Sequence, residues 1–172
     1  MNRWRIPVHG ARRPCCSAST YRRGLKLGCN ALLHRRVHGY DGNASVAFDR
    51  GKRAARVLGV PLRLERVLDN LLDNAVSFSP PEGTISVRLA REGDRVLLSV
   101  CDEGPGIPNS EREKVFARFH TARPEAEGFG DHSGLGLAIA RTIAEAHDGS
   151  LTVADRADGK PGACLVLELP AA

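Results

Sequence analysis

The sequence of 172 residues predicts an α+β domain, a two-layer sandwich with helices on one face of a mixed, mostly antiparallel sheet. Two stretches of alternating apolar and polar residues are each interrupted by a tight turn, which is typical of β-hairpins. Two other segments carry apolar residues at helical spacing. The expected order is helix, two strands, short helix, loop, helix and two strands.

The first 42 residues are predicted to be a basic, disordered tail, and residues 43–172 to form the domain. Residues 1–40 hold nine Lys or Arg and no Asp or Glu, and show no sustained periodicity. The rest of the chain holds 16 basic and 20 acidic residues, so the net charge of +5 belongs to the tail. A specific nucleic-acid partner is therefore not expected.

The cysteines and the hydropathy of the chain add further expectations. Cys101 and Cys164 stand in apolar strand-like runs and are expected to be small core residues. The cysteines and histidines of the tail lack the paired C-x₂₋₄-C spacing of a zinc knuckle, so zinc is not predicted. No apolar run approaches the roughly 18 residues of a membrane span, and no secretory signal is present. A cytoplasmic location is expected.

The first regular elements follow the tail. Short strands are expected at "ASVAF" and "AARVLG", followed by an amphipathic helix over residues 61–78 with proline in its first turn. Residues 84–90 and 95–101 should pair as a hairpin around the turn Glu92-Gly93-Asp94. These segments supply the first helix and the first strand pair of the sandwich.

The second half of the domain is again predicted to be a helix followed by two strands, here preceded by a short helix and a loop. "SEREKVFARF" is predicted to form the short helix, with Ser110 as N-cap and Glu113 three residues later. Residues 121–133 are polar and aperiodic, which predicts a mobile loop. A helix entered through two glycines and ended by Gly149 follows, and the chain closes with a hairpin around Asp158-Gly159.

Asn70 and Asn74 form a polar stripe in the otherwise apolar helix "VLDNLLDNAV". Residues four apart share a helix face, and a buried amide without hydrogen-bond partners costs about 1–3 kcal/mol. Either a polar group covers this face or the stripe lies at the edge of the core.

Two glycine-rich turns, "DEGPGIP" and "SGLGLAIA", match neither a P-loop nor GxGxxG. Gly134 and Gly136 at the start of a helix would let backbone N–H groups approach a phosphate. Asp102 at the end of a strand could accept a hydrogen bond from an amino group such as that of adenine. Each turn alone is better explained as a tight loop, but together with the asparagine pair they suggest a nucleotide.

Four motifs, in this order and spacing, resemble the ATP-binding catalytic domain of sensor histidine kinases, a member of the Bergerat-fold ATPase superfamily. "NLLDNAV" resembles the N box, "DEGPGIP" the first glycine box, "VFARFH" the F box and "SGLGLAIARTIAEAHDGSLTV" the second glycine box. The resemblance covers residues 46–170. It implies a sandwich of Bergerat type that transfers the γ-phosphoryl group of Mg·ATP to a protein histidine.

The resemblance also implies roles for individual residues. Asn74 would bind Mg²⁺, an ion for which an amide oxygen is suitable. Asn70 would lie near the same phosphates, Arg118 would approach the terminal phosphate, and Asp102 would bind the adenine amino group. The nucleotide-binding residues that it implies are Asn70, Asn74, Phe78, Asp102, Gly104, Gly106, Ile107, Phe116, Gly134, Leu135, Gly136 and Leu137.

Residues 121–133 would be the ATP lid. By the same resemblance Phe116 and Phe119 would anchor the base of the lid, and Phe78 would pack on the adenine. The alternative for these three side chains is ordinary core packing.

The identity of Asn70 separates histidine kinases from other members of the superfamily. In gyrase-type topoisomerases, heat-shock chaperones and serine-directed kinases the corresponding residue is typically a glutamate that acts as general base. Asparagine cannot take a proton near neutral pH, which favours transfer to a histidine. An ATP hydrolase or serine kinase of the same fold, and a non-catalytic ATP-dependent binding module, are the alternatives.

The sequence departs from the family pattern in three places. Ser77 stands where many members have Lys or Arg, and His132 and Ser133 replace the glycine and small residue common before "GLGL". No histidine followed by an acidic residue on an amphipathic helix precedes the domain. The expected partners are therefore ATP and a histidine-bearing dimerisation domain on another chain or segment, and through it a response regulator. Alone, the chain is expected to bind ATP and do little chemistry.

Overall fold

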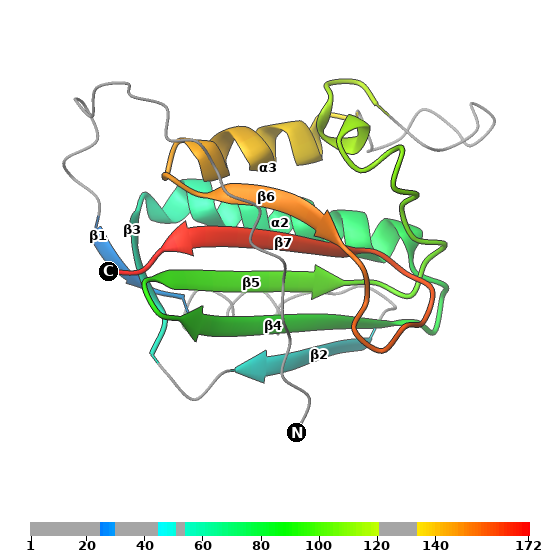
Figure 1. Cartoon of the computed structure of the whole chain (residues 1–172), viewed down its shortest axis with the longest axis horizontal. Coiled ribbons are helices and arrows are strands. Elements are labelled where there is room, and N and C mark those ends of the chain that lie inside the picture. The colour runs from blue at the N-terminus through cyan, green and yellow to red at the C-terminus, as the bar shows by residue number, and fades with distance from the viewer. Residues whose placement is uncertain (1–24, 30–44, 51–53, 121–133) are drawn as a thin grey trace.

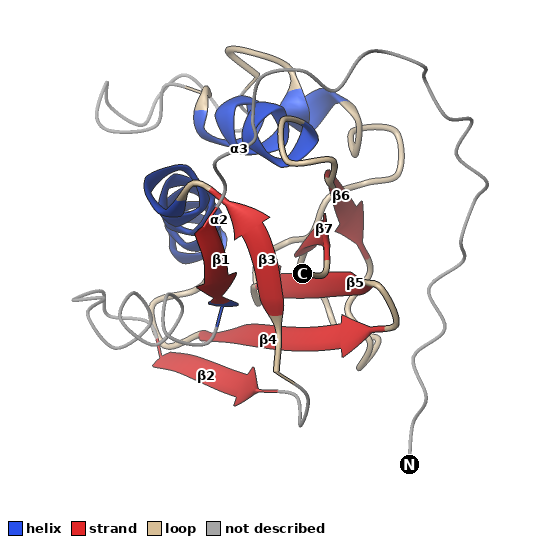
Figure 2. Cartoon of the chain, turned by 90° about the vertical axis from the view of Figure 1, so that its left-hand side faces the viewer, coloured by secondary structure: helices blue, strands red, loops and turns tan. Residues whose placement is uncertain are grey.

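The computed structural model describes residues 25–29, 45–50, 54–120 and 134–172. Its main sheet has the strand order β2-β4-β5-β7-β6. The strands are β2 (Ser45–Arg50), β4 (Thr84–Glu92), β5 (Arg95–Cys101), β6 (Ser150–Ala154) and β7 (Cys164–Pro170). Helices α2 (Pro61–Phe78) and α3 (Gly136–Glu145) lie on the same side of this sheet (Figures 1 and 2). The predicted α+β sandwich is confirmed.

The sheet is mixed, as expected. β4 and β5 form the predicted hairpin, antiparallel from Ser86 opposite Cys101 to Glu92 opposite Arg95. β7 pairs antiparallel with both β5 and β6, whereas β2 runs parallel to β4. The parallel pairing of this sheet is therefore confined to its edge strand β2.

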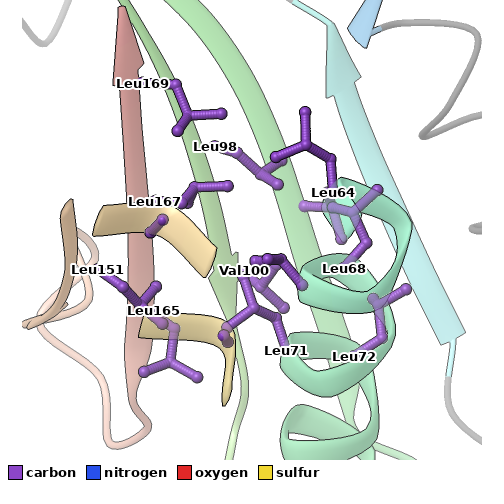
Figure 3. Close-up of a cluster of buried hydrophobic side chains, with 14 of the residues drawn as sticks. Leu64, Leu68, Leu71, Leu72, Leu98, Val100, Leu151, Leu165, Leu167 and Leu169 are labelled. Atoms are coloured by element: carbon purple, nitrogen blue, oxygen red, sulfur yellow. The ribbon is translucent and has the colours of Figure 1, made fainter. Parts of the chain in front are cut away.

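Helix α2 has the predicted bounds, and its apolar face forms the centre of the core. Pro61 occupies the first turn, where its missing N–H has no partner to lose. Figure 3 shows the leucines of α2 packed towards side chains from β5 and β7. The core residues labelled there are Leu64, Leu68, Leu71, Leu72, Leu98, Val100, Leu151, Leu165, Leu167 and Leu169. The buried residues of α2 extend from Leu64 to Ala75, so most of the helix packs on the core.

The predicted short helix at residues 110–119 is wrong. The structure has one turn of 3₁₀-helix, η1 (Lys114–Phe116), after a series of turns, and no side chain caps it. Ser110 is exposed, and the chain is extended again at Ala117. A single turn gains too few hydrogen bonds to propagate a helix, and here Val115 and Phe116 supply its contacts with the core.

Cys164 is a buried core residue, as predicted, and Cys101 is half-buried. The two also form a disulfide, which is not predicted. The two residues are directly opposite each other in the β5–β7 ladder, although 63 positions separate them along the chain. The pairing of β5 with β7, two strands that no short turn connects, brings the two thiols together.

Residues 25–29 also differ from the expectation of a disordered tail. β1 (Leu25–Gly28) pairs antiparallel with β3 (Arg56–Gly59), and the Cys29 N–H donates to the Ala55 carbonyl oxygen at 3.1 Å. Burial raises the pKa of the Cys29 thiol to about 11. β1 pairs with the edge of β3, but a strand of four residues is too short to show an alternating pattern in the sequence. The rest of the predicted tail lies outside the described residues.

Among the described residues no helix is both long and apolar enough to cross a bilayer.

Candidate functional site

Asn70 and Asn74 lie along one face of α2, as the spacing predicts. Asn70 is buried, with 7% of its surface exposed, and its Nδ2 finds no hydrogen-bond partner among the described residues. Asn74, one turn later, is half-buried. A buried amide left without a partner is costly, so this face of α2 is built to meet another polar group.

The start of α3 lies directly beside Asn70. A Cβ added to Gly136 would stand 3.5 Å from the Asn70 Oδ1, so a larger side chain at this position would cover the asparagine. Leu135 is the N-cap residue and makes no side-chain cap, and the first N–H groups of a helix lack partners within the helix. The side chain of Leu137 packs against the core. Leu135 and Leu137 would therefore serve the site through their backbone.

Asp102 directly follows β5 and is held by backbone groups on two sides. Only 3% of its surface is exposed, and its Oδ1 accepts hydrogen bonds from the N–H groups of Gly104 at 2.9 Å and Ala163 at 3.0 Å. Burial raises the pKa of this carboxyl above its ordinary value, while these two bonds and the nearby Arg156 guanidinium act in the opposite direction. The second carboxylate oxygen takes part in neither backbone bond.

The first glycine turn packs against the C-terminal end of α2. A Cβ on Gly104 would lie 2.5 Å from the carbonyl oxygen of Phe78, a contact that only glycine allows. Gly106 faces the backbone of Gly162, and Ile107, which is half-buried, offers its carbonyl oxygen to Arg112 Nε at 3.4 Å. Helix α2 thus joins the two glycine turns, since Asn70 contacts one and Phe78 the other.

The phenylalanines of the predicted lid base play different parts. Phe116 is buried in the core with the Arg141 guanidinium 4.9 Å from its ring centre, which fits the core-packing alternative. The side chain of Phe119 is 74% exposed, but its N–H donates to the Gly134 carbonyl oxygen at 3.0 Å. Both residues of this hydrogen bond have left-handed backbones, with φ of 63° at Phe119 and 64° at Gly134.

The hydrogen bond between Phe119 and Gly134 therefore joins the two segments that flank residues 121–133. Arg118 is exposed beside this junction. The predicted lid itself, with His132 and Ser133, lies outside the described residues.

Arg156 is not predicted from the sequence, but its side chain contacts the backbone of Asp102. Its Nη1 donates to the Asp102 carbonyl oxygen at 2.6 Å, and its Nε and Nη2 form a bidentate pair with Asp158 at 3.0 and 2.6 Å. The one sequence feature that could have pointed to this contact is an arginine two residues before an aspartate at a tight turn. That pattern is common on surfaces and indicates no particular partner.

Known proteins are similar to this chain in sequence. Residues 59–172 match the family described as histidine kinase-, DNA gyrase B- and HSP90-like ATPase. Sensor protein ChvG of Agrobacterium fabrum is 49% identical over 120 residues, which are 67% of this chain and 20% of ChvG. The chain thus spans about a fifth of the length of this curated relative.

Solved structures show the same fold. The mycobacterial sensor histidine kinase MprB superposes with a TM-score of 0.73 at 32% identity, over 87% of this chain and 98% of that one. Full-length ShkA, solved in complex with AMPPNP, gives a TM-score of 0.70 at 27% identity, over 91% of this chain and 33% of ShkA.

Proposed function

The chain belongs to the histidine kinase-, DNA gyrase B- and HSP90-like ATPase family as a histidine kinase-type ATPase domain, and from this we propose that it transfers the γ-phosphoryl group of Mg·ATP to a protein histidine. The acceptor histidine lies outside residues 43–172, on another segment or chain. The observation that carries the proposal is the buried, unpaired amide of Asn70 beside the glycine start of α3.

The phosphates lie between α2 and the start of α3. The unpaired Nδ2 of Asn70 donates to a phosphate oxygen, and Gly136 leaves room for that oxygen because it has no Cβ. Free N–H groups at the start of α3 favour the same anion. Gly134 and the backbones of Leu135 and Leu137 complete this side.

Asn74 holds the magnesium ion through its amide oxygen. The described residues contain no cluster of three or more His, Cys, Asp or Glu that could hold a metal, so the site fits an ion that keeps water and phosphate ligands. When bound, Mg²⁺ neutralises the charge that develops on the phosphate oxygens.

The base lies against the Asp102 turn. Ionised Asp102 accepts a hydrogen bond from the exocyclic amino group of adenine, while guanine presents a carbonyl oxygen there, which a carboxylate repels. Gly104, Gly106 and Ile107 form the wall of this pocket and Phe78 packs on the ring. The complex of the similar ShkA with AMPPNP, an ATP analogue, supports ATP as the nucleotide.

The reaction itself needs positioning more than acid–base chemistry. An imidazole nitrogen of the acceptor attacks the γ-phosphorus, the bond to the β,γ-bridging oxygen breaks, and ADP leaves. Arg118 stabilises the charge on the transferred group, and the segment 121–133 closes over it as the lid. Because Asn70 cannot accept a proton from water or serine, histidine is a better acceptor than either.

The partners follow from this reaction. They are a dimerisation domain that bears the histidine and a response regulator that receives the phosphoryl group, both in the cytoplasm, where ATP is available. A non-catalytic module that only binds ATP is the second candidate, favoured by Ser77 at a position where many relatives carry a cation.

The test is transfer of label from γ-labelled ATP to an added dimerisation hairpin of a related sensor kinase. Wild-type protein should label the hairpin, and Asn74→Ala should reduce both labelling and Mg²⁺-dependent binding of a fluorescent ATP analogue. Asn109→Ala, which removes the same amide from an exposed loop, should match wild type. Labelling that survives Asn74→Ala would contradict the metal role, and binding without labelling would favour the non-catalytic module.

A further inference from the structure

Arg156 connects the β6–β7 turn to the end of β5. Its side chain is only 9% exposed, an extent of burial that an arginine reaches only when its charge is paired. Asp158 fixes two of its nitrogens, and the third donates to the carbonyl oxygen of Asp102 at 2.6 Å. The guanidinium cannot move without breaking one of these bonds.

The same arginine reaches a second residue of the glycine turn. Its Nη2 lies 3.8 Å from the Glu103 Oε1, and the other oxygen of Glu103 accepts the Thr84 N–H at 3.0 Å. A bidentate arginine is rigid in a way that a lysine is not, because its donors are held in one plane. Residues 102 and 103 are thus held from the β6–β7 turn.

Asp102 itself is held at three further points, all through Gly104 and Ala163. Its N–H donates to Ala163, and its Oδ1 accepts from both Ala163 and Gly104. Backbone groups therefore fix one carboxylate oxygen, and Arg156 fixes the peptide that follows. A small rotation of that peptide would displace the carboxylate as well.

We propose that Arg156 is the positioning residue for base recognition: it contacts no nucleotide, and it fixes Asp102 in the orientation that selects adenine. This rests on the proposed function, in which Asp102 accepts from the base. The positive charge has a second effect, because attraction to Arg156 lowers the pKa of Asp102 against the effect of burial. Arg156 is the charged group that acts on this carboxylate, and Arg156 in turn pairs with Asp158 from its own turn and lies near Glu103 from the Asp102 loop.

The test is a double-mutant cycle on ATP and GTP affinity, measured by calorimetry at fixed Mg²⁺. Arg156→Met should weaken ATP binding about tenfold and lower the ATP-to-GTP preference, a coupling within the range seen for residues of one network. In an Asp102→Asn background the same change should cost less than about twofold, because the carboxylate that Arg156 positions is already gone. A merely structural arginine would weaken binding equally in both backgrounds, and that result would overturn the proposal.

Further variants separate charge from geometry. Arg156→Lys keeps the charge but cannot bind Asp158 and the Asp102 carbonyl together, so it should lose affinity without changing the pH dependence of binding. Arg156→Met should move the acid loss of ATP affinity to higher pH. Lys160→Met, which removes an exposed cation from the same turn, should leave affinity and pH profile unchanged.

The outcomes remain informative if a variant does not fold. Asp158→Asn releases the guanidinium but keeps its charge, so it replaces Arg156→Met in the same cycle, with the same criterion of unequal loss. An Asp102→Asn protein with unchanged ATP affinity and unchanged ATP-to-GTP ratio would refute the base site of the proposed function, and this proposal with it. A normal Asp102→Asn effect with no Arg156 effect would overturn the positioning role alone.

Discussion

Helix α2 adjoins two differently built halves of the candidate site, one at its last residue, Phe78, and one at Asn70 in the middle of the helix. At the Phe78 end, Asp102 is held by backbone N–H groups and by Arg156, and each of these contacts exists within the chain itself. At Asn70, a buried amide nitrogen has no partner among the described residues and faces a glycine. Bonds within the chain fix the Asp102 half in place, whereas the Asn70 half leaves a buried amide nitrogen without a partner among the described residues.

The difference indicates how the two halves contribute to binding. A group fixed before binding loses little entropy when the ligand arrives, so the Asp102 half should set selectivity. An unpaired group destabilises the free protein and is stabilised on binding, so the Asn70 half should couple nucleotide binding to stability. Four experiments test this contrast.

The largest effect is expected at Asp102. Asp102→Ala leaves the N–H groups of Gly104 and Ala163 without their acceptor and should lower the free energy of unfolding by about 2–3 kcal/mol. Asp102→Asn keeps an acceptor oxygen and should cost about 1 kcal/mol or less. Urea unfolding of the nucleotide-free proteins measures both. Equal losses would show that the carboxylate does not organise this half.

The two glycines that face α2 give the second contrast. Gly104→Ala would force a Cβ to 2.5 Å from the Phe78 carbonyl oxygen and should destabilise the domain by about 2 kcal/mol. Gly136→Ala meets Asn70 at an ordinary 3.5 Å, so it should fold normally but bind ATP less well. Melting temperature and ATP affinity of the two variants separate these effects. A stable Gly104→Ala protein would contradict the packing of this turn.

Replacing Asn70 should have the opposite sign from replacing Asp102. Asn70→Leu removes a buried amide nitrogen that has no partner among the described residues, so it should raise the stability of the free domain by about 1 kcal/mol. The same variant should no longer be stabilised by Mg·ATP in a thermal shift assay. Asn109→Leu on the exposed loop is the control. A loss of stability in Asn70→Leu would mean that the amide has a structural partner.

The smallest effect is expected from pH. Burial raises the pKa of Asp102, and the ionised form binds adenine, so ATP affinity should fall on acidification at a higher pH than for an exposed aspartate. The stability of the nucleotide-free domain should depend on pH in the opposite direction. The raised pKa of Asp102 contributes stability that is lost as the pH rises through that pKa. ATP titrates too, so the quantity to compare is the difference between wild type and Asp102→Asn. No difference between them would exclude Asp102 from the pH response.

Much of the fold can be predicted from the sequence where one segment determines its own structure. The bounds of helix α2 are predictable because both its proline start and its apolar face lie within eighteen residues. The two hairpins are predictable for the same reason, since each turn and its flanking strands are contiguous. Three features depend on contacts between residues that are distant in the sequence, and a local pattern cannot predict them. They are the 3₁₀ turn at Lys114–Phe116, the strand β1 and the Cys101–Cys164 disulfide.

The candidate site shows the same limit. The asparagine pair Asn70 and Asn74, taken together with Asp102 and the two glycine-rich turns, suggests a nucleotide from the sequence. Arg156 is not predictable in this way, because its role depends on the β6–β7 turn folding back against the end of β5. The roles of all four in binding stay predictions.

The disulfide between Cys101 and Cys164 closes part of the chain into a covalent macrocycle. The ring includes both glycine turns, the predicted lid and α3, whereas α2 with its two asparagines lies outside it. A protease that cuts once inside the ring, anywhere from residue 102 to 163, leaves two fragments joined through sulfur. The oxidised domain therefore keeps its mass after such a nick, and separates into two pieces only when a reductant opens the ring.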